Sequence, residues 1–185
     1  MLKSLTLIAA MLVTVARLSG GQATSLDELA PSFKQLGPGW TSNYIVFCVD
    51  QLHPTNEICN ESKRWLELAH RVVGKEGCEA YAIMRYYAGT NHVLVWMYRY
   101  QSKEHLPKWG TNKQATAELG KLGKLPQVGD KVDFYQRNGV HNNIVFQRDT
   151  YSVDVEGSIY EFERLKKVAE AFDRNLLRAQ KPDGR

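Results

Sequence analysis

The most regular pattern in the chain is a two-residue alternation of apolar and polar side chains, which is typical of β-strands with two different faces. Two such segments, 79–88 and 91–101, are separated only by Gly89 and Thr90. Glycine in the first place of a two-residue loop suits a type II′ hairpin turn. This turn predicts the pairs that share one face of the hairpin: Tyr87 with His92, Arg85 with Leu94, Ile83 with Trp96, and Tyr81 with Tyr98. That face is aromatic, and the other face is aliphatic.

Four further segments have the composition of strands. Residues 43–49 are dense in β-branched and aromatic side chains, and the segments 131–137, 141–148 and 151–156 follow one another with short connections. The last three segments predict a meander of antiparallel strands.

The first connection in this meander sets the register of its strands. A two-residue turn at 138–139 would pair the apolar Val132 and Phe134 with polar residues. A three-residue loop over 138–140 pairs them instead with Phe146 and Ile144, so that apolar side chains share one face. We therefore predict the longer loop.

Apolar residues at every third or fourth position mark the helices. A short helix begins at Ser25, a second covers 56–73, a third lies over 113–119, and the last follows a capping-box sequence at 158–161. Hairpins alternating with helices predict an α+β fold, a mostly antiparallel sheet of five to six strands with helices packed on it. We expect one α+β domain over residues 24–180 and a flexible tail over 181–185.

The first 23 residues have the pattern of an export signal. Lys3 supplies a positive start, an apolar run follows from Leu5 to Ala16, and Gly21 and Ala23 are small residues before a cleavage site. The apolar run is shorter than the ~20 residues that cross a bilayer. We predict cleavage after Ala23 and a secreted or periplasmic protein without a membrane span.

Charge and histidine spacing exclude several classes of partner. The chain has 24 Lys and Arg and 20 Asp and Glu, a formal net charge of +4. Loss of Lys3 and Arg17 with the leader leaves 22 basic against 20 acidic residues, or +2, which does not indicate a nucleic-acid partner. The histidines lack the paired spacing of zinc ligands, so we expect no metal site and no cofactor.

Three cysteines, Cys48, Cys59 and Cys78, follow the leader, and an odd number leaves one thiol over in an oxidising compartment. Cys59 and Cys78 flank most of the predicted second helix, which separates them by ~20 Å and excludes a bridge between them. The predicted disulfide is therefore Cys48–Cys59, and the alternative is a set of unpaired, buried thiols.

A thiol and an imidazole form the strongest catalytic arrangement. Cys59 falls in the first turn of the predicted second helix, where the helix dipole lowers a thiol pKa, and His141 lies on a later strand. The stretch from Val128-Gly-Asp130 to His141 resembles the "GD-x-V-x-F … H" region of papain-like cell-wall peptidases. The resemblance implies a cysteine hydrolase, although the residues after Cys59 depart from the small residues of that family. In the alternative, both residues have structural roles.

The aromatic face of the hairpin is the candidate binding surface. Tyrosine and tryptophan bury apolar area while their polar atoms stay in water, which suits contact with a ligand or protein. The same side chains could instead form the core beneath the helices. The candidate binding residues are Tyr81, Arg85, Tyr87, His92, Trp96 and Tyr98.

A second resemblance concerns the overall pattern. The aromatic strand ending in Ser102, Gly129-Asp130 before the meander, and the closing amphipathic helix are similar to a family of short exported bacterial domains of unknown function. The similarity covers about residues 79–178 and implies the fold and the export, but no reaction. We therefore expect a non-enzymatic binding or accessory module for a protein or small-molecule ligand. The alternatives are the cysteine hydrolase and a structural or self-associating module.

Overall fold

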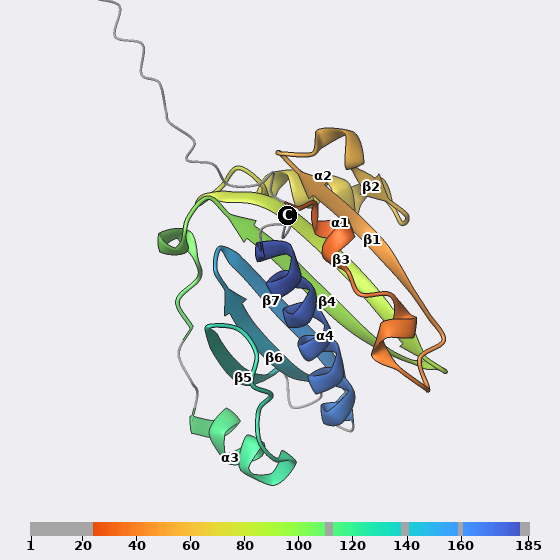
Figure 1. The fold of residues 1–185 in the computed structure, drawn as a ribbon, viewed down its shortest axis with the longest axis vertical. Coiled ribbons are helices and arrows are strands. Elements are labelled where there is room, and N and C mark those ends of the chain that lie inside the picture. The colour runs from red at the N-terminus through yellow and green to blue at the C-terminus, as the bar shows by residue number, and fades with distance from the viewer. Residues whose placement is uncertain (1–23, 110–112, 138–140, 159–160, 182–185) are drawn as a thin grey trace, which may run out of the picture.

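Seven antiparallel strands form one sheet, with helices on both of its faces (Figure 1). The computed structural model describes residues 24–109, 113–137, 141–158 and 161–181. The sheet has the order β2-β1-β3-β4-β7-β6-β5. The strands are β1 (Ser42–Asp50), β2 (Ile58–Cys59), β3 (Cys78–Ala88), β4 (Asn91–Tyr100), β5 (Lys131–Arg137), β6 (His141–Arg148) and β7 (Tyr151–Ser158). The helices are α1 (Leu26–Leu29), α2 (Lys63–Val72), α3 (Lys113–Leu122) and α4 (Phe162–Gln180), with 3-10 turns η1 (Phe33–Leu36), η2 (Pro54–Asn56) and η3 (Lys103–His105).

The predicted α+β class and the antiparallel sheet are confirmed, with one strand more than expected. The additional strand is β2, which pairs with β1 at one edge of the sheet. The prediction of a helix over 56–73 was wrong in its first half, because α2 begins only at Lys63. Asn60 explains the difference: its side-chain Nδ2 donates to the carbonyl oxygen of Ile45 at 2.6 Å, and its backbone N–H donates to that of Val46 at 2.9 Å. These bonds hold the segment extended along β1.

Both predicted registers are confirmed. In the β3–β4 hairpin, Tyr87 pairs with His92 and Ile83 pairs with Trp96. Gly89 has a φ of +66°, the left-handed conformation that the predicted turn requires. In the meander, β5 and β6 pair as the three-residue loop demands: Val132 with Phe146 and Phe134 with Ile144.

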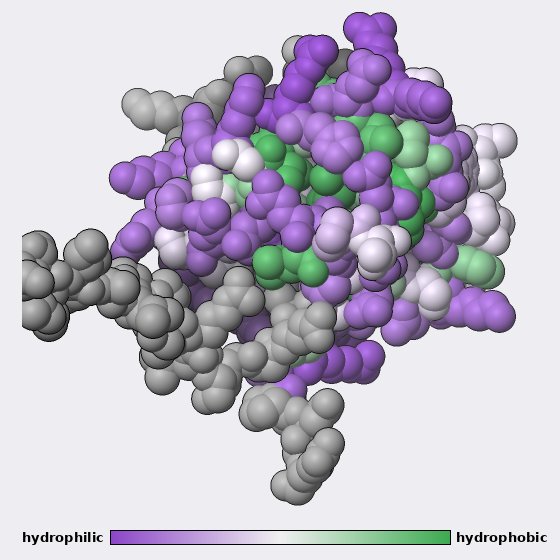
Figure 2. Space-filling model, turned by 90° about the horizontal axis from the view of Figure 1, so that it is seen from above, coloured by the Kyte–Doolittle hydropathy of each residue, from purple (hydrophilic) through white to green (hydrophobic). Residues whose placement is uncertain are grey.

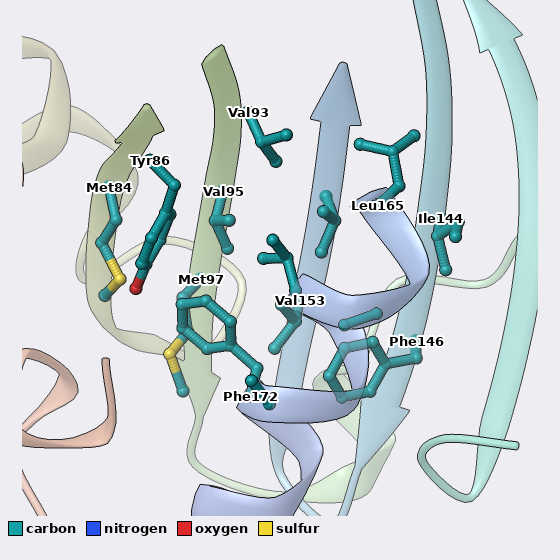
Figure 3. Packing of buried hydrophobic residues seen from close by; sticks show 14 of the residues in the cluster. Met84, Tyr86, Val93, Val95, Met97, Ile144, Phe146, Val153, Leu165 and Phe172 are labelled. Carbon is teal, nitrogen blue, oxygen red and sulfur yellow. The ribbon is translucent and has the colours of Figure 1, made fainter. Parts of the chain in front are cut away.

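The aliphatic face of the sheet forms the main core beneath α4 (Figure 3). Phe172 of α4 is fully buried, with its ring edge-on to that of Tyr86 at 5.9 Å. Leu165 lies so close to β7 that a Cβ on Gly157 would come within 2.7 Å of it. The predicted capping box at 158–161 was wrong, because Ser158 ends β7 and α4 begins at Phe162. The strand residues shown around α4 are Met84, Tyr86, Val93, Val95, Met97, Ile144, Phe146 and Val153.

The opposite face of the sheet carries a second, smaller core beneath α2. Ala69 of α2 is fully buried against β1 and β3, and Trp65 stacks on Phe47 at 6.3 Å between ring centroids. The helix has only 10 residues, about 15 Å of length, and its strand contacts are with β1, β2 and β3. The rest of this face therefore depends on other parts of the chain for cover.

An ion-pair network joins α4 to the meander. Arg148 of β6 donates to both carboxylate oxygens of Asp173 on α4 at 2.8 Å and to Asp130 at 2.9 Å. Asp173 also accepts a bond from the N–H of Gly129 at 3.1 Å, and Asp130 accepts one from the N–H of Asp149. The Gly129-Asp130 pair, which suggested family resemblances in the sequence, therefore has a structural role here.

We expect Asp173→Ala to lower the free energy of unfolding by about 2–3 kcal/mol, because Arg148 loses its best-buried partner. Glu163→Gln on the exposed side of α4 is the control and should change it by less than about 0.5 kcal/mol. Urea unfolding at neutral pH measures both. Equal effects of the two substitutions would contradict the role given to this network.

A second buried ion pair joins β1 to β4. Arg99 donates to Asp50 through both terminal nitrogens, and both side chains are almost fully buried. Arg99 also donates to the carbonyl oxygen of Thr24 at 3.2 Å. Burial alone would raise the pKa of the Asp50 carboxyl, but the hydrogen bonds and charge of Arg99, with help from His53, hold this pKa below its ordinary value.

This pair predicts a loss of stability in acid. Because the pKa of Asp50 is lower in the folded than in the unfolded chain, the pair stabilises the fold above the unfolded pKa of about 4, and the stabilisation disappears as the pH falls through the folded pKa. Asp50→Asn should lower stability at pH 7 and lose less stability between pH 7 and pH 3 than the parent. Urea unfolding at the two pH values tests this; parallel losses in the two proteins would contradict it.

The predicted leader, 1–23, and most of the predicted tail, residues 182–185, lie outside the described residues. Within the described ranges, no helix is both long enough and apolar enough to cross a membrane.

Candidate functional site

On the side of the sheet that faces away from α4, α2 contacts β1, β2 and β3. The β4 residues Leu94, Trp96, Tyr98 and Tyr100 pack against the edge of the same small core. We call the part of this side formed by β4, β7, β6 and β5 the open face. The pairing of the strands places Trp96 beside Asp154, Leu94 beside Glu156, and Tyr135 beside Asn143. The open face therefore combines aromatic side chains from β4 with carboxylates from β7.

A cavity of about 390 Å³ lies at one end of the open face. Its roof comes from the segment after β4, which is held over the sheet by two bonds: Gln147 donates to the carbonyl oxygen of Pro107 at 2.7 Å, and Lys131 donates to that of Trp109 at 3.2 Å. The volume lies in the range of small-molecule sites. The lining residues are Tyr98, Tyr100, Pro107, Trp109, Tyr135, Val145, Ser152 and Asp154.

A smaller cavity of about 240 Å³ lies at the other end of the same strands. His92 and His141 line it from β4 and β6, and Glu156 lines it from β7. The Nδ1 atom of His141 is 3.9 Å from a carboxylate oxygen of Glu156. Asp154 and Glu156, which line one cavity each, are thus two residues apart on β7.

Asn143 connects the two cavities through its side-chain amide. Its Nδ2 lies 2.8 Å from an Asp154 oxygen, 3.2 Å from the hydroxyl of Tyr135 and 3.4 Å from a Glu156 oxygen. Tyr135 also donates from its hydroxyl to Asp154. The Asn143 side chain is fully buried, and its Oδ1 has no hydrogen-bond partner. Asn143, Asp154, Glu156 and Tyr135 form what we call the polar cluster.

Two tyrosines of the larger cavity, Tyr98 and Tyr100, have raised pKa values. Burial, the neighbouring Tyr81 and the charge of Asp154 together raise the pKa of Tyr98 far above its ordinary value. Burial, with Cys78 and Glu76, raises the pKa of Tyr100 to about 12. The rings therefore present neutral phenols at physiological pH.

The six predicted binding residues lie on one side of the β3–β4 hairpin but differ in burial and in the elements that they contact. Trp96 and Tyr98 are half-buried on the open face, and His92 is exposed in the smaller cavity. Tyr81 is buried beside α2, with its ring stacked on Tyr98 at 4.5 Å between centroids.

The other two predicted binding residues, Arg85 and Tyr87, contact Tyr44 of β1. Arg85 donates to the hydroxyl of Tyr44 at 2.6 Å and to Glu61 at 2.9 Å, and Tyr87 stacks on Tyr44. Arg85 is thus engaged in an ion pair that joins β3 to the residues before α2.

The residues of the predicted catalytic pair lie far apart. Cys59 is in β2 and not in a helix, so no helix dipole acts on it in the way the sequence suggested. His141 is in β6, five strands away across the sheet, or about 24 Å at the usual strand spacing. A nucleophile and its base must approach within hydrogen-bond reach, about 3 Å.

The predicted Cys48–Cys59 disulfide is not formed, and all three cysteines are free. The register explains why: Cys59 pairs with Phe47, and Cys48 pairs with Ile58, so the two thiols point to opposite faces of the sheet. Cys48 lies in the core beneath α4, where burial raises its pKa to about 12, and burial raises that of Cys78 to about 11.

Sequence reasoning did not single out the polar cluster. Val153 and Val155 alternate with Asp154 and Glu156 along β7, and this alternation shows that the two carboxylates share a face. The pairing of β4 with β7 joins segments separated by two strands and α3 in the chain, and no local pattern announces it.

Two further findings bear on the site. In the described part of the chain, no group of three or more His, Cys, Asp or Glu side chains is arranged to hold a metal ion. Comparisons with protein-family models, curated proteins and solved structures find no match.

Figure 2 views the molecule from above relative to Figure 1. This surface is largely hydrophilic, with hydrophobic patches between the charged and polar residues.

The thiols provide a test of the cysteine assignments. We expect iodoacetamide to modify only Cys59 in the native protein at pH 7.5, because Cys48 and Cys78 are buried and their raised pKa values leave almost no thiolate. Unfolding without reductant should expose three reactive thiols. Mass spectrometry of labelled peptides measures both counts. A single reactive thiol after unfolding would show that two of the cysteines form a disulfide.

Proposed function

We propose that the protein is a non-enzymatic binding module and that its ligand occupies the open face. One observation carries this proposal: half-buried aromatic rings and the carboxylates of Asp154 and Glu156 line two cavities at opposite ends of the same strands. Ligand sites commonly combine apolar walls with a few positioned polar groups. The open face has both.

The arrangement favours binding over catalysis by the predicted pair. Cys59 and His141 are five strands apart, so His141 cannot activate the Cys59 thiol. Trp96 stands on β4 between Leu94 and Tyr98, which line one cavity each, and it packs against the small core beneath α2.

The four tryptophans allow a direct test of this site. We expect fragments from a general small-molecule library to shift the indole N–H signals of Trp96 and Trp109 in ¹H–¹⁵N spectra. Trp40, buried on the α4 side, and Trp65, on α2, are internal controls that should not move. Shifts confined to Trp65 would place binding on α2, and a library without any binder at Trp96 or Trp109 would contradict the proposal.

Substitution of Trp96 separates binding from folding. We expect Trp96→Ala to weaken fragment binding at least tenfold while lowering the free energy of unfolding by less than the ~3–5 kcal/mol typical of a fully buried aromatic residue. Phe172→Ala, in the core beneath α4, is the matched control and should show that full loss. Urea unfolding and NMR titration give the two quantities. Unimpaired fragment binding by Trp96→Ala would count against the site. An apparent mass that rises with protein concentration in light scattering would favour a self-associating module instead.

A further inference from the structure

The walls of the larger cavity consist mainly of rings. Tyr98 and Tyr100 stand two residues apart on β4, with their ring planes 28° apart and their centroids separated by 6.3 Å. Trp109, Tyr135 and Pro107 complete the ring-bearing wall. Walls of this kind favour a ligand with flat apolar surfaces over one that is polar on all sides.

The hydrogen-bonding groups that the cavity offers to a ligand are mainly donors. The hydroxyls of Tyr100 and Ser152 and the indole N–H of Trp109 have no hydrogen-bond partner among the described residues. The indole can only donate, and burial raises the pKa of Tyr100 to about 12, so this phenol also keeps its proton. The Asp154 carboxylate, by contrast, already accepts from Tyr135 and Asn143. A ligand that brings acceptors therefore completes the hydrogen bonds of this cavity.

A proline-rich segment in the polyproline II conformation combines both properties. This conformation has no internal hydrogen bonds, so its carbonyl oxygens are free to accept, and proline has no backbone N–H that would need an acceptor. Its rise of ~3.1 Å per residue separates residues i and i+2 by ~6.2 Å along the axis, close to the 6.3 Å between the Tyr98 and Tyr100 rings. Because the conformation is already formed before binding, little chain entropy is lost.

We infer that the larger cavity binds a proline-rich segment of a partner protein. This inference rests on the function proposed above and names its ligand class. Prolines pack on Tyr98 and Tyr100, and the Tyr100 hydroxyl and the Trp109 indole donate to carbonyl oxygens of the segment. The cavity of about 390 Å³ is small for a ligand site, so the contact involves a short stretch, about one turn of three residues.

Two uncharged peptides test the class of ligand. Both are capped at their ends and about eight residues long; one consists of proline, and the other alternates glycine and serine, which forms a flexible coil. We expect the proline peptide to bind at least tenfold more tightly, as measured by titration of the Trp109 indole N–H signal of the full protein. The indole signal of Trp65, on α2, is the internal control and should not move.

A single hydroxyl links this preference to the cavity. Tyr100→Phe keeps the ring and removes one donor, so it should weaken binding of the proline peptide by about threefold or more. Tyr44→Phe is the matched control, because this hydroxyl lies on β1 and bonds to Glu61, and it should leave the affinity unchanged. Circular dichroism of both variants checks that they are folded.

The outcomes distinguish this inference from the function on which it rests. Equal affinity for the two peptides, or unchanged affinity in Tyr100→Phe, would overturn the proline-rich ligand. Binding of neither peptide, while library fragments shift the Trp109 signal, would also overturn it and leave the binding module in place. Failure of every fragment to bind at the open face would remove the proposed function itself.

Discussion

The structure depends on a mismatch between the width of its sheet and the helices available to cover it. Seven strands span about 29 Å, whereas a helix with its side chains is about 10–12 Å wide. On one face, the 19 residues of α4 combine with α1 and η1 to bury an aliphatic core. On the other face, α2 has only 10 residues and ends over β1 and β3. The open face follows from this shortage of helix.

Two ion-pair networks stabilise this sheet, one between its strands and one between the sheet and α4. Arg99 and Asp50 join β4 to β1, which are separated in the sheet by β3, and Arg148 joins the meander to Asp173 of α4. Both networks lie on the α4 side of the sheet, whereas the polar cluster bonds β5, β6 and β7 to one another on the open face.

Much of the fold was readable from the sequence because it rests on local rules. The Gly89 turn fixes the β3–β4 register, and the requirement that Val132 and Phe134 share a face with their partners gives the β5–β6 register. Long-range pairing was not readable. β2 was assigned to a helix because local spacing does not show the bonds from Asn60 to β1, and the position of Trp96 beside Asp154 depends on the pairing of β4 with β7. The candidate site consists mainly of such long-range contacts.

The polar cluster combines a structural gain with a cost. Tyr135 donates to Asp154, and Asn143 donates to Asp154 and Glu156, so the cluster bonds β5, β6 and β7 to one another. The fully buried Oδ1 of Asn143 has no hydrogen-bond partner, a cost that an apolar residue at this position would not carry. Buried polar groups kept at such a cost are commonly found at functional sites, and this amide bonds to the β7 carboxylates that line the two cavities.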